Sequence, residues 1–115
     1  MNELAIATHT SGAWHIIALT GDLDLHTAPQ LRTAVEAREL SPNHGLVIDL
    51  SELTYCDSSG ITALLVAQRL TTAAAAPMAL AAVPSRVART FKLAGLDQLF
   101  TIHPTTADAT ATDPA

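Results

Sequence analysis

The segment Leu46-Val47-Ile48-Asp49-Leu50 constrains the fold more than any other, because it is a short and almost unbroken apolar run. A run of this length predicts a strand that is covered on both faces, as central strands of parallel sheets are. The run from Met78 to Val83 has the same character, and helical spacing of apolar residues separates the two runs. Because parallel neighbours require a crossover, this alternation predicts an α/β fold with a mixed, mostly parallel sheet and helices packed on it.

The start of the chain predicts an antiparallel hairpin. Two β-rich runs, Leu4 to Thr8 and Ala13 to Thr20, flank Thr10-Ser11-Gly12, and Gly21 is expected to end the second strand. Thr27 and Gln30 form a T-x-x-Q pattern that predicts a capping box at the start of a helix. Further along, we expect helices over residues 59–72 and 84–94, with Gly95 as a stop, and a short last strand over 99–102.

Length and composition predict one globular domain. The chain has 115 residues, of which 49% are hydrophobic and 15% charged, so it can bury a core of its own. We place the domain at residues 1–103. The tail from Pro104 to Ala115 contains only Pro, Thr, Ala and Asp, which predicts disorder.

The charge balance and cysteine content exclude several classes of partner and site. Six Lys and Arg residues against eleven Asp and Glu give a net charge of −5, which disfavours nucleic acid and anionic lipid as partners. The single cysteine, Cys56, allows no intrachain disulfide. The N-terminus lacks a signal-like pattern, and no apolar stretch approaches the ~20 residues needed to span a bilayer. These features predict a cytoplasmic protein.

Polar side chains gather where two predicted strands end. Asp22, Asp24, His26 and Thr27 follow the second strand, and Asp57-Ser58-Ser59 follows the third. In open α/β sheets these carboxyl-end loops are where ligands and partners bind. The two serines also stand at a helix start, where free N–H groups and the helix dipole favour an anion such as phosphate. A simpler role for Asp57 or Ser58, that of an N-cap, is compatible with this one.

Other chemistries fit the sequence less well. Ser58 is not in a G-x-S-x-G elbow, and the five histidines show no metal-ligand spacing. Strand-end aspartates in a receiver-type domain hold Mg²⁺ and accept a phosphoryl group, but that chemistry usually recruits a lysine, and the one lysine, Lys92, lies in the last helix. Cys56 is expected to be buried. We therefore expect no enzymatic activity, no metal and no cofactor.

The helix that follows Gly60 has almost no polar face before Gln68. Such a helix is either wholly buried or partly exposed for a partner. Because Gly60 has no side chain and lies close to Ser58, we expect it to let another backbone approach. The segment therefore resembles a docking surface more than a catalytic pocket.

Three segments resemble the anti-sigma factor antagonists, the standalone STAS domains of bacteria. They are Thr20-Gly21-Asp22-Leu23-Asp24-Leu25-His26-Thr27-Ala28, Val47-Ile48-Asp49-Leu50-Ser51 and Tyr55-Cys56-Asp57-Ser58-Ser59-Gly60-Ile61. Val87-x-Arg89-x-Phe91-x-x-x-Gly95-Leu96 is similar to the last helix of the family and its stop. The resemblance covers Leu4 to His103 and implies the STAS fold. Relatives often continue into another amphipathic helix, for which the tail has too little apolar content.

The resemblance implies a partner-switching mechanism in transcription regulation, of the kind used in stress response or sporulation. The chain would bind an anti-sigma factor that is also a serine kinase and so free a sigma factor. The kinase would phosphorylate Ser58, and a phosphoserine phosphatase would restore the binding form of a monomer or weak dimer. The residues expected to contact the partner are Asp22, Asp24, His26, Thr27, Asp57, Ser59, Gly60 and Ile61. The alternative is a STAS-type sensor or scaffold that binds a small anion or nucleotide without phosphorylation.

Overall fold

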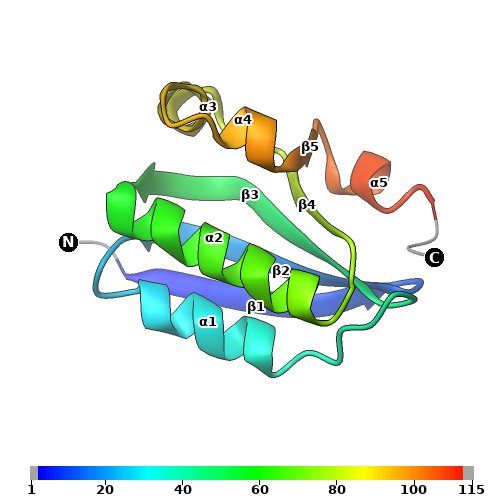
Figure 1. Cartoon of the computed structure of the whole chain (residues 1–115). Coiled ribbons are helices and arrows are strands. Elements are labelled where there is room, and N and C mark those ends of the chain that lie inside the picture. The colour runs from blue at the N-terminus through cyan, green and yellow to red at the C-terminus, as the bar shows by residue number, and fades with distance from the viewer. Residues whose placement is uncertain (1–2, 113–115) are drawn as a thin grey trace.

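A computed structural model describes residues 3–112 of the chain. Its five strands form one sheet in the order β1-β2-β3-β4-β5, in which only the first pair is antiparallel (Figure 1). The strands are β1 (Leu4–Ser11), β2 (Trp14–Leu23), β3 (Gly45–Cys56), β4 (Met78–Ala81) and β5 (Thr101–His103). The helices are α1 (Ala28–Glu36), α2 (Ser58–Ala73), α3 (Ser85–Leu93), α4 (Leu96–Leu99) and α5 (Thr106–Ala109). The predicted fold class and the N-terminal hairpin are confirmed.

The apolar run that predicted a central strand occupies the middle of the sheet. Leu46, Val47 and Ile48 are fully buried, and β3 pairs with β2 on one side and β4 on the other. Beyond Leu50, where the apolar run ends, the strand continues to Cys56, because β2 extends far enough to pair with it. Gly21 does not end β2 either. It adopts a positive φ of 109° beside a register shift, and the strand runs on to Leu23.

The main core lies between the sheet and the pair α1 and α2, which pack side by side on one face (Figure 1). Leu31 and Val35 of α1 and Leu64 of α2 are buried there against Ile17 and Ile48 of the sheet. These residues repeat every three or four positions in the helices and alternate in the strands, which is why periodicity located them.

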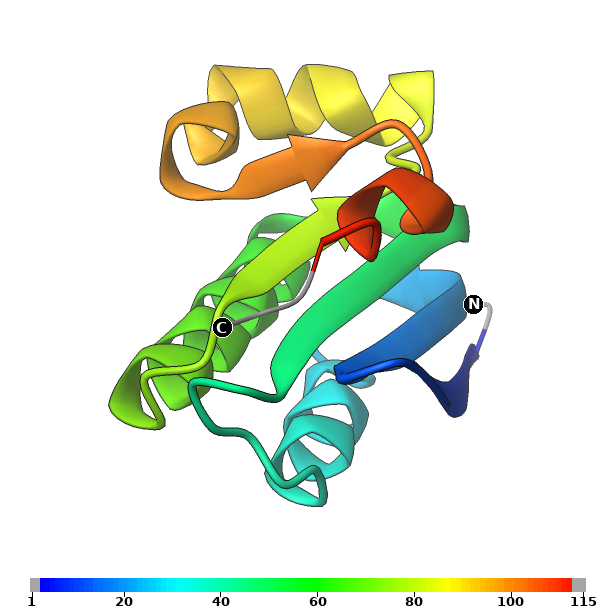
Figure 2. The same ribbon diagram turned by 90° about the vertical axis from the view of Figure 1, so that its right-hand side faces the viewer.

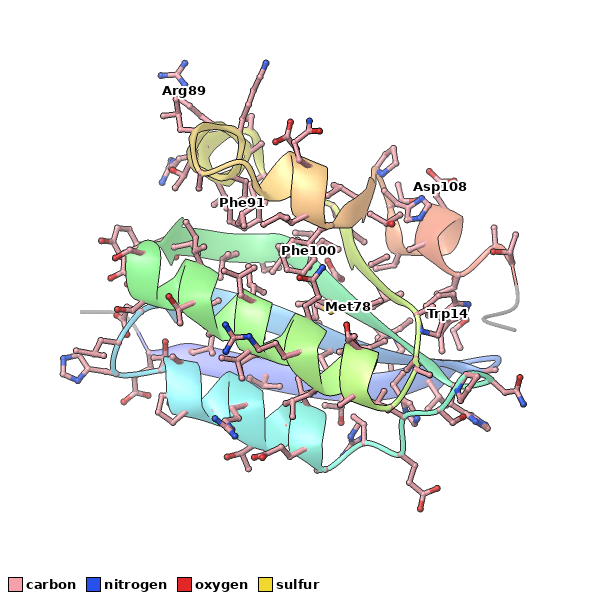
Figure 3. All side chains as sticks on the ribbon, viewed as in Figure 1. Trp14, Met78, Arg89, Phe91, Phe100 and Asp108 are labelled. Carbon is pink, nitrogen blue, oxygen red and sulfur yellow. The ribbon has the colours of Figure 1, made fainter. Side chains whose placement is uncertain are left out.

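The opposite face of the sheet carries a smaller core, and the C-terminal segment covers it (Figure 2). Ala109 of α5 is buried in the same cluster as Trp14 and Val47, and Trp14 Nε1 donates a hydrogen bond to Thr112 O at 2.7 Å. Figure 3 shows Trp14 close to this segment. The prediction of disorder from Pro104 therefore differs from the structure over residues 104–112, because a few small apolar contacts and one tryptophan hold the segment. Residues 113–115 lie outside the described part of the chain.

Candidate functional site

The loops that follow β2 and β3 lie next to each other because the two strands pair up to their last residues. Asp22 is in register with Tyr55, and Leu23 with Cys56. The Thr54 hydroxyl donates a 2.8 Å hydrogen bond to Asp22 Oδ1 across the two strand ends. The two polar sets that the sequence placed at strand ends therefore meet at one edge of the sheet.

The loop after β3 presents Ser58 to solvent. Asp57 is the N-cap of α2, and its Oδ1 accepts a 3.0 Å hydrogen bond from Gly60 N. The helix begins at Ser58, whose side chain is exposed, and no hydrogen bond among residues 3–112 engages its hydroxyl. The cap takes the Gly60 N–H, and the N–H groups of Ser58 and Ser59 stay available to an anion. Of the two residues considered for the N-cap, Asp57 has the role, and Ser58 stays accessible.

Gly60 packs against the chain itself. It is buried, and a Cβ at this position would overlap Leu23 O and lie 2.7 Å from Cys56 Sγ. The start of α2 therefore lies directly on the end of β2. The close approach that the glycine permits is internal, which corrects the expectation that Gly60 admits a partner's backbone.

The loop after β2 is closed by its own hydrogen bonds. Asp24 and Thr27 are only 7% and 5% exposed. Asp24 Oδ1 accepts from the backbone N–H groups of His26 and Thr27 at 2.9 and 3.1 Å, and the Thr27 hydroxyl donates to Asp22 O at 2.8 Å. The predicted capping box is wrong, since the Thr27 side chain caps nothing in α1. Asp24 and Thr27 shape the loop, and little of either side chain is exposed.

The accessible part of this edge is a surface that we call the Ser58 face. It consists of Asp22, Leu25, His26, Tyr55, Asp57 and Ser58. Leu25 is 69% exposed and Tyr55 50%, although both are large and apolar. Sequence reasoning missed them. Leu25 lies two positions after the buried Leu23, where strand alternation would also bury it, but the chain leaves the strand at Leu23 and turns Leu25 outward.

A groove of about 330 Å³ runs between α1 and α2 and opens beside this face. Its lining is mainly apolar and comprises Leu25, Ala28, Pro29, Arg32, Ser59, Thr62, Ala63 and Val66. Of the predicted contact residues, Ser59 lines the groove and Ile61 is half-buried in α2. The unusually apolar α2 is thus partly buried and partly exposed along this groove.

Comparison with known proteins shows to which family the chain belongs. The chain matches the STAS domain over residues 5–109. It belongs to the STAS domain family. The anti-sigma-B factor antagonist of Listeria monocytogenes is 29% identical over 86 residues, which are 75% of each chain. An anti-sigma factor antagonist from Mycobacterium paratuberculosis superposes with a TM-score of 0.83 at 26% identity, covering 95% of this chain and 92% of that one. The phosphorylated form of the Bacillus cell fate determinant SpoIIAA superposes with a TM-score of 0.67 at 22% identity, covering 91% of this chain and 96% of that one.

The single thiol of this STAS domain lies at the same edge. Cys56 is buried, as expected, and burial, with Asp57 as a lesser cause, raises the pKa of its thiol to about 12. A thiol with that pKa is almost entirely protonated at neutral pH and is a poor nucleophile. Residues 3–112 contain no cluster of three or more His, Cys, Asp or Glu side chains that could hold a metal ion. Over the same residues, no helix has the length and apolar character needed to cross a bilayer.

Proposed function

We propose that the chain is an anti-sigma factor antagonist whose binding to an anti-sigma factor is switched off by phosphorylation of Ser58. The observation that carries the proposal is the exposed Ser58 hydroxyl in the first turn of α2, next to a cap made by Asp57. A serine in this place is reachable by a kinase, and its modification leaves the core untouched.

The names of two relatives and the phosphorylated form of a third support the proposal. The similar proteins of Listeria monocytogenes and Mycobacterium paratuberculosis are named anti-sigma factor antagonists, and SpoIIAA, which shares this fold, exists in a phosphorylated form. By the same argument the chain acts as a regulatory binding protein and not as an enzyme. It works in the cytoplasm without a cofactor of its own, as a monomer or weak dimer. The anti-sigma factor supplies the serine kinase, and a phosphatase reverses the step.

Electrostatics decides how the switch acts. A phosphoserine carries about −1.5 to −2 charges at neutral pH. A unit like-charge pair ~6 Å apart costs about 2–3 kcal/mol at an effective dielectric of ~20. Asp57 already gives this edge negative charge. The phosphate makes the edge more negative and repels any acidic group of the partner. Within the domain, the helix dipole at the start of α2 stabilises the phosphate by ~0.3–1 kcal/mol. Phosphorylation therefore weakens binding by roughly a hundredfold while the fold persists.

The docking surface combines the Ser58 face with the groove between α1 and α2. Leu25 and Tyr55 provide the exposed apolar area that a partner can cover, and Asp22 and His26 provide a polar rim. Ser59 and Ile61 contribute from α2. The loop after β2 and the start of α2 are kept in place by Asp24, Thr27 and Gly60, and these residues thereby position the docking surface.

The alternative of a small-anion or nucleotide sensor is less well supported by the same edge. The shallow hollow at the loops is lined by Asp22, Asp24 and Asp57, together with Leu25, His26 and Tyr55. Three carboxylates oppose a phosphate or nucleotide there. A titration with ATP in the absence of kinase separates the two functions, since a sensor would bind the nucleotide alone.

The deciding experiment is phosphorylation of the purified chain by the anti-sigma factor of the organism that encodes it. Intact-mass and peptide mass spectrometry after incubation with ATP should show one phosphate on wild type and on Ser59→Ala, and none on Ser58→Ala. Ser59 is the matched control, because it is the neighbouring hydroxyl but half-buried in the groove. Phosphate that persists on Ser58→Ala would overturn the assignment.

A further inference from the structure

Half of the positive side chains of this acidic protein lie on one short helix. Of the six Lys and Arg residues in the sequence, Arg86, Arg89 and Lys92 are in α3, and all three are exposed. Their spacing of three residues places them along one side of the helix, over a rise of about 9 Å. Figure 3 shows the Arg89 side chain pointing away from the rest of the fold, while Phe91 points inward. We call these three residues the basic stripe.

Little in the described chain accounts for the stripe. The one ion pair among residues 3–112 is Arg32 with Glu36, so the stripe has no acidic partner within the described chain. Like charges three residues apart repel, and Arg86 in the first turn opposes the helix dipole, whereas the dipole favours Lys92 in the last turn. The buried face of α3, with Val87 and Phe91, is sufficient to hold it on the sheet. The stripe is therefore available to an outside partner.

A groove lies between the last part of β3 and the start of α3. It measures about 310 Å³ and is lined by Ser51, Glu52, Leu53, Thr54, Pro84, Ser85 and Arg86. Of its lining residues, Thr54 donates a hydrogen bond to Asp22 of the Ser58 face, and Arg86 is the first residue of the stripe. Both surfaces follow the carboxyl ends of parallel strands, since α2 follows β3 and α3 follows β4. Glu52 is the one acidic residue in this lining, and it faces the same hollow as Arg86.

We propose that the basic stripe binds an acidic segment of the same partner that covers the Ser58 face. The proposal rests on the proposed function and adds the chemistry of the partner. On a chain of net charge −5, the stripe is the densest group of cations and the surface that best attracts an acidic segment, so it fixes where that segment of the partner docks. Three cations are few for nucleic acid, whose specific complexes neutralise about 6–10 phosphates, and the net charge opposes it as well.

The test compares two substitutions of equal charge on two exposed helix positions. Arg89→Glu alters the stripe, whereas Arg69→Glu alters α2 at an exposed position that lines neither groove. Association and dissociation rates with the purified anti-sigma factor are measured by stopped flow at low and high salt. We expect Arg89→Glu to bind about tenfold more weakly at low salt, with the deficit shrinking at high salt, and Arg69→Glu to stay within about twofold of wild type. Equal effects of the two substitutions would overturn the proposal.

A second measurement distinguishes a failure of the stripe proposal from a failure of the proposed function. Ser58→Asp is measured on the same partner: if it weakens binding and Arg89→Glu does not, the stripe proposal fails and the switch stands. If wild type does not bind the anti-sigma factor, the switch fails, and a hexaglutamate peptide then tests the stripe by amide NMR. Shifts over Ser85–Leu93 that vanish in Arg89→Glu uphold the acidic-partner chemistry. No shifts, or tighter binding to single-stranded DNA or phosphatidylserine vesicles than to the peptide, overturn it.

Discussion

The two loops at the carboxyl ends of β2 and β3 contain the same kinds of side chain but use them in opposite ways. After β2, Asp24 and Thr27 turn inward, and their hydrogen bonds go to the loop itself and to the entrance of α1. After β3, Asp57 makes a single cap bond to Gly60, and Ser58 remains exposed. An aspartate and a hydroxyl thus form a scaffold in the first loop and an accessible site in the second.

Burial explains the difference. The first loop has three residues between Asp24 and the start of α1, so the chain folds back and its polar groups must satisfy one another once water is excluded. The second loop has one residue between β3 and α2, so the helix begins at once and its first residue points outward. Gly60 joins the two regions by packing on Leu23. A substitution in the first loop should therefore act on stability, and one at Ser58 on binding.

Ser58→Asp should have the largest effect, a loss of anti-sigma factor affinity of about a hundredfold. The carboxylate adds negative charge to the Ser58 face, and the helix start tolerates it, so the melting temperature should stay at or slightly above that of wild type. Calorimetric titration and thermal melting are measured on the same samples. A melting temperature many degrees lower would show that Ser58 belongs with the scaffold.

Gly60→Ala should be the most destabilising change at the junction, by about 2–3 kcal/mol in the free energy of unfolding. Alanine usually favours a helix by about 1 kcal/mol over glycine, but here its Cβ meets the backbone oxygen of Leu23, which cannot move aside. Urea unfolding followed by circular dichroism measures the loss, with the exposed Thr72→Ala of α2 as the control. Unchanged stability would mean that α2 does not rest on the end of β2.

Asp24→Ala should cost about 1–2 kcal/mol of stability, because it leaves the N–H groups of His26 and Thr27 without their acceptor. Asp24→Asn keeps an acceptor oxygen and should lose clearly less. Urea unfolding distinguishes the two variants, and the affinity of each for the partner is measured alongside. If Asp24→Ala is as stable as wild type and binds more weakly, Asp24 is a contact residue and the contrast between the loops fails.

Asp22→Asn should have the smallest effect, a two- to threefold slower association with the anti-sigma factor at low salt that disappears at high salt, because it removes a charge that we expect to meet cationic groups of the partner. Asp22 is half-buried and accepts a hydrogen bond from Thr54, which an asparagine oxygen can also accept, so stability should hardly change. Stopped-flow association at two salt concentrations measures it. Rates equal to wild type at low salt would leave Asp22 outside the interface.

The sequence by itself determined the order of the main elements and the position of Ser58. The apolar run around Ile48, the alternation in the hairpin and the helical spacing after Gly60 are local patterns, and each survives in the structure because burial follows the period of the element. A cap at Asp57 or Ser58 was also predictable, since it involves residues three apart, and the structure assigns it to Asp57. These features depend on neighbours along the chain.

Only the tertiary structure decided which polar residues are exposed and what holds the C-terminal segment. The buried Asp24 and Thr27, the internal packing of Gly60 and the outward Leu25 depend on where β2 ends and on which strand lies beside it. The contact of Trp14 with Thr112 joins residues 98 positions apart, and without it the Pro- and Thr-rich tail has little reason to fold. Local composition does not encode such contacts, because their energy arises only when distant segments exclude water together.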